Sequence, residues 1–347
     1  MASEAEIAAM SDAVRAASNG PDRTHPNPRV GCVLLGDDGR TIAVGVHRGP
    51  GTPHAEVDAL GQAGGRAHDA TAVVTLEPCD HTGRTGPCSE ALIAAGVRRV
   101  VYAQADPTDE AGGGAARLSA AGVDVEGGVL AEDAYALNEH WTHAVRTGRP
   151  FVTWKLAATI DGRSAAADGT SRWISGPEAR IDTHRMRAEV DAIAVGTGTV
   201  LIDNPRLTVR DEHDRLVGTQ PMRVVIGARE VPADRNVWSD EAPTRHFATR
   251  DITAVLQTLY DDGVRDVWLE GGPTLAGAFL EAGAVDEVIA YVAPMLLGSG
   301  LAALQTPAVT TIAEAWRLDP IDVTTVGADV RITARPATQQ SNPEETA

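Results

Sequence analysis

The residues best suited to chemistry are one histidine and two cysteines in the first third of the chain. His54 follows Pro53 and precedes Glu56 by two positions, and Cys79 and Cys88 each follow a proline. One imidazole and two thiolates suit a zinc ion that keeps its fourth position open. Glu56 lies close enough to move protons without binding the metal. The spacing therefore predicts a catalytic zinc site with His54, Cys79 and Cys88 as its ligands.

This pattern is typical of zinc enzymes that remove ammonia from amino-pyrimidine or amino-purine rings. Zinc lowers the pKa of its bound water toward neutrality, and Glu56 would carry protons from that water to the ring nitrogen and the leaving ammonia. The segment 80–87 separates the two cysteines, and such a loop would bring His81 and Arg84 toward a substrate. A purely structural zinc site is the competing interpretation, but it would require a fourth protein ligand.

A second residue stands out because of its rarity. Lys155 is the only lysine among the 30 lysines and arginines of the chain. A lone lysine indicates a position that needs a compact ammonium or an amine able to lose its proton. Chance survival of one lysine is the alternative.

Composition limits the possible classes of protein. The chain has 347 residues, of which 43% are hydrophobic and 22% charged, so we expect two globular domains. We find neither a secretory signal nor an apolar run of about 20 residues, so we expect a cytoplasmic protein without a membrane partner. A net charge of −18 disfavours nucleic acid but allows a small phosphorylated substrate. Three cysteines argue against a disulfide framework, and Cys32 is expected to be a buried strand residue.

The hydrophobic pattern of the first domain, residues 1–147, predicts a three-layer α/β fold. We expect helices over 4–18, 53–64, 89–95, 115–121 and 130–145, and strands over 30–35, 41–46, 71–76, 98–103 and 123–125. A turn-rich break at 146–150 separates this domain from the next.

The second domain, residues 148–336, is also expected to be α/β, and the polar tail 337–347 to be disordered. We expect strands over 151–156, 192–195, 222–226, 266–270, 287–293 and within 322–334, with helices over 177–189 and 275–282. Glycine-rich loops follow two of these strands, at 196–199 and 271–274. Such loops can bind phosphate through backbone N–H groups, although plain connections look the same.

Several motifs together resemble the bifunctional deaminase/reductase family of riboflavin biosynthesis. In the first domain they are residues 25–31, 45–47, 54–56, 75–79, 81–85 and 87–88. The resemblance implies a cytidine-deaminase fold acting on a diaminopyrimidinone that carries a phosphoribosylamino group. It also implies substrate contacts at Asn27, His47, His81 and Arg84. Taken alone, Asn27 could be a turn former and His47 and His81 surface histidines. Residues 106–114 differ from the sequence that is usual in the family. This difference affects the expected conformation of that loop and not the zinc chemistry.

The resemblance continues through 155–157, 161–163, 173–175, 194–199, 203–205, 207–210 and 270–277. It implies a dihydrofolate-reductase-like domain that uses NADPH to reduce the ribosyl group to ribityl. Implied substrate contacts are Ser171, Arg187, Leu207, Arg210 and Glu270, with the two arginines as clamps on the phosphate. Implied cofactor contacts are Ala157, Trp173, Thr199, Asp203, Gly272, Pro273, Thr274, Leu275, Ala276, Gly277 and Ala278.

Three further expectations concern this domain. Gly227, Ala228 and Arg229 replace the family's usual Asp-Ser, so Arg229 is expected to bind the 2′-phosphate of NADPH. Lys155 and Glu270 are candidates for proton handling or for holding the open-chain sugar. The resemblance also implies a homodimer.

Two rival interpretations remain at this point. One is a nucleoside- or tRNA-type zinc deaminase with an accessory domain that is not a reductase, which the acidic charge disfavours. The other is a zinc-stabilised binding module without turnover, which the free Glu56 beside the metal disfavours.

Overall fold

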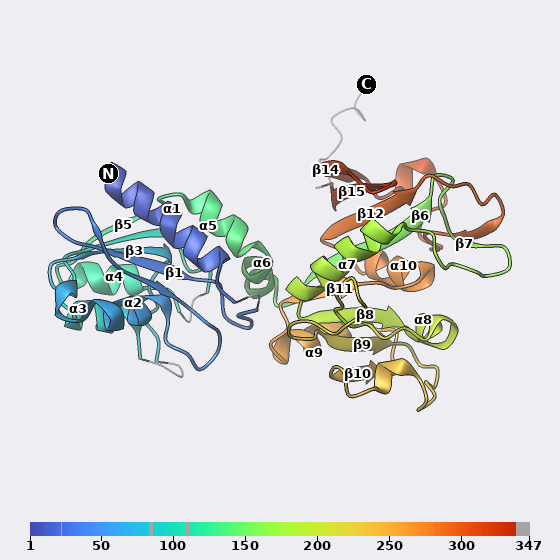
Figure 1. The fold of residues 1–347 in the computed structure, drawn as a ribbon, viewed down its shortest axis with the longest axis horizontal. Helices are drawn as coiled ribbons and strands as arrows, with labels where there is room; N and C mark the ends of the chain where they lie inside the picture. Colours follow the sequence, from blue (N-terminus) through green and yellow to red (C-terminus); the bar gives the residue numbers. More distant parts are fainter. Residues whose placement is uncertain (22, 83–85, 109–110, 338–347) are drawn as a thin grey trace, which may run out of the picture. The chain divides into compact units, whose positions relative to one another are not determined.

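The computed structural model describes residues 1–21, 23–82, 86–108 and 111–337. The chain divides into two compact units with the division between Arg149 and Pro150 (Figure 1). Each unit is built on its own β-sheet, in agreement with the α/β class expected for both halves. Arg84 lies outside the described residues.

The first unit contains a five-stranded sheet with the order β2-β1-β3-β4-β5. Its strands are β1 Gly31–Leu35, β2 Thr41–Val46, β3 Thr71–Leu76, β4 Arg99–Gln104 and β5 Asp124–Gly127. The first two form an antiparallel hairpin, whereas β3, β4 and β5 run parallel. Every residue of β1 and β3 is buried because helices cover both faces of the sheet. Cys32 is fully buried on β1, as expected.

Helices cover both faces of this sheet (Figure 1). They are α1 Glu4–Ser18, α2 Ala55–Ala63, α3 Cys88–Ala94, α4 Gly114–Ala120, α5 Ala131–Leu137 and α6 Glu139–Thr147. Helices α1 and α5 pack on one face, and α2, α3 and α4 on the other. The first helix has the predicted bounds, with Ser3 and Glu6 forming a capping box.

The single helix predicted over 130–145 is wrong. It is divided at Asn138, whose backbone leaves the helical region and whose buried side chain bonds the backbone N–H and C=O of Arg29. This tertiary contact outweighs the continuous helical pattern, because a buried amide must have its hydrogen bonds satisfied.

The second unit contains an eight-stranded sheet with the order β10-β9-β8-β11-β6-β12-β15-β14. These strands are β6 Phe151–Thr159, β8 Ala192–Gly196, β9 Met222–Ile226, β10 Thr244–Phe247, β11 Asp266–Leu269, β12 Glu287–Ala293, β14 Leu318–Val326 and β15 Asp329–Pro336. From β10 to β12 all neighbours are parallel, and an antiparallel hairpin completes the β12 side. The two glycine-rich loops follow β8 and β11, which are adjacent, so both loops lie at the same edge of the sheet.

The helices of this unit are α7 Pro177–Glu189, α8 Thr197–Asp203, α9 Ile252–Asp261 and α10 Pro273–Glu281. Helices α9 and α10 contribute to one apolar core and α7 and α8 to the core on the other face. The sequence-based prediction lacks α9, although Ile252, Val255, Leu256 and Leu259 recur at helical spacing behind an Asp251 cap. It also lacks β10 and the small sheet of β7 Arg163–Ala166 and β13 Gly300–Ala302.

Side-chain alternation along the strands decides which residues meet in this unit. Val152 and Trp154 belong to the core beneath α9 and α10, so Thr153 and Lys155 point to the α7 face. Ile193, Trp268 and Tyr291 lie in the core on that same face. Leu269 on β11 pairs with Trp154 on the parallel strand β6. The next residues of the two strands, Glu270 and Lys155, therefore lie beside each other.

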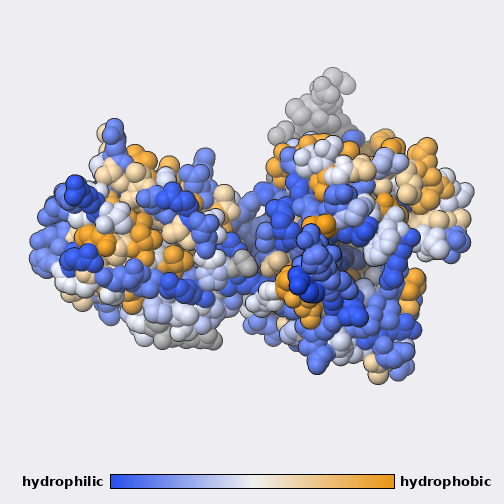
Figure 2. Space-filling view, in the orientation of Figure 1, coloured by the Kyte–Doolittle hydropathy of each residue, from blue (hydrophilic) through white to orange (hydrophobic). Residues whose placement is uncertain are grey.

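The outer surface is mostly hydrophilic on the face shown in Figure 2, with hydrophobic residues scattered among polar ones on each unit. Among the described residues, none of the helices has the length and apolar character needed to cross a bilayer.

Candidate active sites

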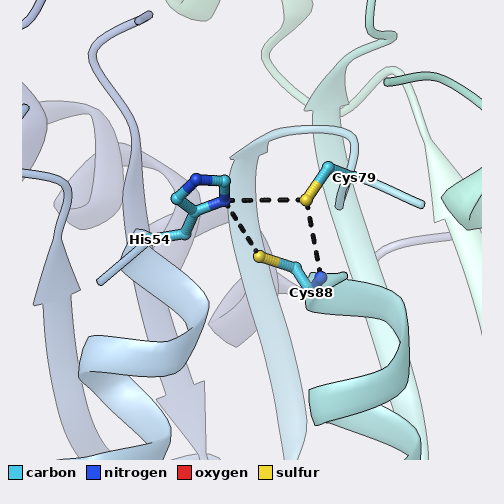
Figure 3. Close-up of side chains that lie close together, drawn as sticks. All are labelled: His54, Cys79 and Cys88. Atoms are coloured by element: carbon cyan, nitrogen blue, oxygen red, sulfur yellow. Dashed lines mark hydrogen bonds between the residues drawn. The ribbon is translucent and has the colours of Figure 1, made fainter. Parts of the chain in front are cut away.

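The predicted zinc ligands converge in the first unit (Figure 3). His54 caps the start of α2, Cys79 follows β3, and Cys88 is the first residue of α3. Nδ1 of His54 lies 3.6 Å from Sγ of Cys79 and 3.3 Å from Sγ of Cys88. Ligand atoms on a tetrahedral zinc are separated by about 3.5 Å, as follows from ordinary Zn–S and Zn–N bond lengths. The three donors therefore fit one zinc ion with a fourth position left over.

The charge state of these donors also fits a cation. Hydrogen bonding to Cys88 and to His54 lowers the pKa of Cys79 to about 4. The neighbouring thiolate and burial raise the pKa of Cys88, because two anionic sulfurs repel each other. A backbone N–H of Cys88 points at Sγ of Cys79 at 3.5 Å. A divalent cation would remove the repulsion and allow both sulfurs to ionise.

Glu56 occupies the position expected of a proton carrier. It lies in the first turn of α2 and is only 4% exposed. Burial, together with the negative charge of Cys79, raises its pKa to about 7. A carboxyl group with a pKa close to the working pH can both accept and donate a proton. It is absent from the set of converging metal donors among the described residues.

Asn27 and His47 form one hydrogen-bonded unit beside the metal ligands. Nδ1 of His47 lies 3.0 Å from the carbonyl oxygen of Pro53, and Nε2 lies 3.0 Å from Nδ2 of Asn27. Burial lowers the pKa of His47, so the ring is neutral: Nδ1 donates to the carbonyl and Nε2 accepts from the Asn27 amide. This leaves the Asn27 side-chain oxygen as an acceptor. His47 is 3% exposed, so its interpretation as a surface histidine is wrong.

The segment around Cys79 is held by a second loop. Glu77 is buried and accepts from the backbone N–H groups of Asp106, Gly113 and Ala115. A Cβ atom on Gly114 would lie 1.7 Å from the carbonyl oxygen of Pro78, so only glycine fits there. His81 lies half-buried at the end of this segment, and its Nδ1 has no partner within the described residues. The loop that departs from the family pattern therefore supports the metal-binding segment.

The second unit contains a cleft of roughly 1590 Å³ at the carboxyl ends of its parallel strands. This is the edge at which open α/β sheets ordinarily bind ligands. Both glycine-rich loops line it, as do all the predicted reductase substrate residues: Ser171, Arg187, Leu207, Arg210 and Glu270. Lys155 also lines it. His184 and Arg250, which were not predicted as site residues, line the same cleft; no local motif marks either of them.

Glu270 and Lys155 form the charged centre of this cleft. Arg187 on α7 holds Glu270 with a two-pronged ion pair, both contacts being 2.6 Å. Burial alone would raise the pKa of Glu270, but Arg187, Lys155 and Trp268 lower it to about 2. Burial lowers the pKa of Lys155, partly opposed by the charge of Glu270. Glu270 is therefore a permanent acceptor near neutral pH, whereas Lys155 is a cation that can lose its proton more readily than usual.

Most of the predicted cofactor residues also line the cleft. Those that do are Ala157, Trp173, Thr199, Asp203, Arg229, Gly272, Pro273, Thr274, Leu275 and Ala278. Ala276 and Gly277 are not among the lining residues, and their assignment to the cofactor site stays a prediction. Ala276 is buried in the core, and Gly277 packs against the backbone of Gln305, where a Cβ atom would lie 2.4 Å from the carbonyl oxygen.

Two of the predicted binding arginines, Arg229 and Arg210, differ in the partners that they already have. Arg229 is exposed and lies over Thr197, with 3.3 Å between its Nε and the hydroxyl oxygen. Arg210 is already paired with Glu241 at 2.7 Å, and Arg206 shares that carboxylate. A phosphate at Arg210 would therefore have to compete with Glu241.

Comparison with known proteins agrees with this division. Residues 3–104 match the model of the cytidine and deoxycytidylate deaminase zinc-binding region, and residues 150–332 match that of the RibD C-terminal domain. The riboflavin biosynthesis protein RibD of Mycobacterium tuberculosis is 53% identical over 311 residues, covering 88% of this chain and 90% of the relative. The chain belongs to the RibD family. RibD of Escherichia coli is 42% identical, covering 92% of this chain and 96% of its own length.

Solved RibD structures show the same fold. A structure of Acinetobacter baumannii RibD matches with a TM-score of 0.88 at 38% identity, covering 96% of this chain and 99% of the other. A Thermotoga maritima diaminohydroxyphosphoribosylaminopyrimidine deaminase/5-amino-6-(5-phosphoribosylamino)uracil reductase matches with a TM-score of 0.86 at 32% identity, covering 96% and 99%.

Family membership settles the enzyme class. The protein is a RibD deaminase/reductase of riboflavin biosynthesis, with a zinc-dependent deaminase and an NADPH-dependent reductase. The predicted resemblance, fold class and enzyme class are confirmed. The rival with a non-reductase accessory domain is wrong, since the RibD C-terminal model covers the second unit. The binding module without turnover is wrong as well.

Proposed function

We propose that this chain performs in succession the two reactions named for its Thermotoga relative. The domain formed by residues 1–147 deaminates the diaminopyrimidinone that carries a phosphoribosylamino group. The domain formed by residues 148–336 then reduces the ribosyl group of the resulting 5-amino-6-(5-phosphoribosylamino)uracil to ribityl. The observation that carries the proposal is the presence of a complete zinc donor set with Glu56 in one unit and a charged cleft at the strand ends in the other.

In the deaminase, His54, Cys79 and Cys88 would hold zinc. When bound, zinc supplies a water that is acidic enough to act as a nucleophile near neutral pH. Glu56 accepts a proton on its carboxylate and returns protons to the ring nitrogen and to the leaving amine. The free oxygen of Asn27, fixed by His47, accepts a hydrogen bond from the pyrimidine. The Nδ1 of His81, which has no partner among the described residues, supports a contact with the substrate, and Arg84 is proposed to contact it as well.

In the reductase, the cofactor supplies the hydride. In the loop from Gly272 to Leu275, the backbone N–H of Thr274 lies at the start of α10, where no side chain among the described residues caps the helix, and this suits a cofactor phosphate; Pro273 has no N–H, and that of Leu275 donates to the Gly272 carbonyl. Ala157, Trp173, Thr199, Asp203 and Ala278 are proposed as further cofactor contacts. Arg229 is proposed to bind the 2′-phosphate, which its exposure and its place beside the loop of α8 support.

The permanently charged Glu270 is proposed to accept a hydrogen bond from the pyrimidine and not to donate protons. Lys155 is proposed to handle a proton on the open-chain sugar, because burial makes its ammonium more acidic than usual. Ser171 and Leu207 are proposed as further substrate contacts, with Arg187 and Arg210 near the phosphate. The homodimer, the cytoplasmic location and the absence of nucleic-acid and membrane partners stay predictions.

Each half can be tested with its own substrate. The diaminopyrimidinone phosphoriboside without NADPH should release ammonia, and the deaminated uracil with NADPH should oxidise the cofactor. Failure of the second reaction in a sample that completes the first would refute the assignment of the second domain.

A further inference from the structure

Trp268 is a buried core residue that contacts Glu270, which lines the cleft. Its indole Nε1 donates a hydrogen bond to Oε1 of Glu270 at 2.7 Å. Glu270 lines the cleft, whereas Trp268 is absent from the cleft lining and is only 2% exposed. Any effect of Trp268 on a bound ligand must therefore pass through Glu270.

The strand geometry explains why the indole reaches this carboxylate. Trp268 lies on β11, and Glu270 is two residues further on, so both side chains point to the same face of the sheet. That face is the one beneath α7, which contributes Arg187. Trp268 is packed among Ile193, Ile289 and Tyr291, so its ring has no room to turn. The N–H group is consequently a fixed donor.

The hydrogen bonds of Glu270 show what this donor changes. Oε1 accepts from Nε of Arg187 at 2.6 Å and from Trp268, whereas Oε2 accepts from Nη2 of Arg187 at 2.6 Å. Each carboxylate oxygen has two lone pairs. Within the part of the chain that the structure describes, Oε1 is therefore saturated and Oε2 keeps one acceptor position. Arg187 alone would leave one position on each oxygen, so it is Trp268 that makes the two oxygens unequal.

We propose that Trp268 is a positioning residue of the reductase, which directs the single free acceptor of Glu270, on Oε2, toward the pyrimidine. The inference rests on the proposed contact between Glu270 and the substrate. Trp268 stabilises the bound pyrimidine only through this acceptor, so it has no effect on the cofactor. The KM values for the two ligands should therefore respond differently when the N–H group is removed.

The test uses the full-length, zinc-loaded protein and measures NADPH oxidation with 5-amino-6-(5-phosphoribosylamino)uracil. One variant is Trp268→Phe. In a second, Trp268 is replaced by 3-benzothienylalanine, which keeps the shape of the indole and lacks its N–H. Both should raise the KM for the pyrimidine about tenfold, as expected if Oε2 turns away and its hydrogen bond from the pyrimidine, a bond to a charged group, is lost. The KM for NADPH should change by less than about twofold. Trp238→Phe is the matched control, because that indole donates to the Pro232 carbonyl away from the cleft.

The possible results separate the explanations. An unchanged pyrimidine KM in the 3-benzothienylalanine variant would overturn the proposal, even if Trp268→Phe is impaired or fails to fold, because only packing would then matter. An equal rise in both KM values would also overturn it. Glu270→Gln tests the underlying contact separately: an unchanged pyrimidine KM in that variant would refute the role of Glu270 itself.

Discussion

At the scale of single residues, Glu56 tests the deaminase chemistry. Glu56→Gln keeps the shape of the side chain but removes a group that can accept and return a proton. Ammonia release should fall by about 10³-fold, the effect typical of losing a general acid/base. Zinc content should be unchanged, because Glu56 is not among the three converging donors. Metal analysis of the purified variant is the check, and loss of zinc from it would contradict the assigned role.

Lys155 gives the corresponding test in the reductase. Lys155→Arg keeps a positive charge but replaces the compact ammonium with a guanidinium that does not release its proton. We expect NADPH oxidation to fall by about 10²-fold, with ammonia release unchanged. Arg185→Lys is the matched control, since Arg185 is exposed on α7 and pairs with Asp182. Near-normal turnover of Lys155→Arg would remove Lys155 from the mechanism.

Glu270 should make the second domain sensitive to acid. Its pKa is lowered from 4.5 to about 2, so its ion pair stabilises the folded state above about pH 4.5 and is lost as the pH falls toward 2. The full contribution of this pKa shift to the free energy of unfolding is about 3 kcal/mol. Glu270→Gln should therefore be less stable at pH 7, and the difference from wild type should shrink between pH 4.5 and 2.

Tryptophan fluorescence during urea unfolding is a suitable measurement, because Trp141 is the only one of the six tryptophans in the first unit. A difference in unfolding free energy that stays constant from pH 7 to pH 3 would show that the carboxylate of Glu270 is not stabilised as described.

At the scale of elements, the close packing of Gly114 against Pro78 should control the zinc site. A Cβ atom at Gly114 would displace the carbonyl of Pro78, which directly precedes a ligand. We expect Gly114→Ala to lower zinc affinity and deamination by at least tenfold while NADPH oxidation is retained. Gly61→Ala is the control, because its Cβ would meet no atom within 4 Å and helices favour alanine. Equal zinc affinity in both variants would argue against this role for Gly114.

The elements also show what sequence reasoning can and cannot reach. The zinc ligands were predictable because His54, Cys79 and Cys88 belong to a motif whose chemistry depends on residue type. The burial of His47 was not, because its contacts with Asn27 and Pro53 form only when separate segments of the first unit come together. The burial of Ala276 and Gly277 in α10 could have been predicted from the helical period.

Other features of the structure were not predicted from the sequence for similar reasons. The division of the helix at Asn138 depends on a contact with Arg29 far away in sequence, so a local pattern could not reveal it. Helix α9 could have been found, since its apolar spacing and its Asp251 cap are both visible in the sequence. The contact of Trp268 with Glu270 was also readable in principle, because residues two apart on a strand share a face.

At the scale of the whole molecule, the two chemistries should be separable by removing the metal. All three zinc donors belong to the unit that ends at Arg149, and the residues lining the cleft begin at Trp154. Treatment with a chelator should abolish ammonia release and leave NADPH oxidation with the deaminated uracil within about twofold of its original rate. Added zinc should restore deamination. A parallel loss of both activities would show that the reductase also depends on the metal.

The central claim is that one chain carries two active sites that act in a fixed order. The most direct measurement gives the purified protein the diaminopyrimidinone phosphoriboside and NADPH together and follows ammonia and NADPH in the same sample. We predict that ammonia appears first, that NADPH oxidation follows after a lag, and that both reach one equivalent per substrate. Glu56→Gln should stop both signals. NADPH oxidation without prior ammonia release, or ammonia release without oxidation, would contradict the account.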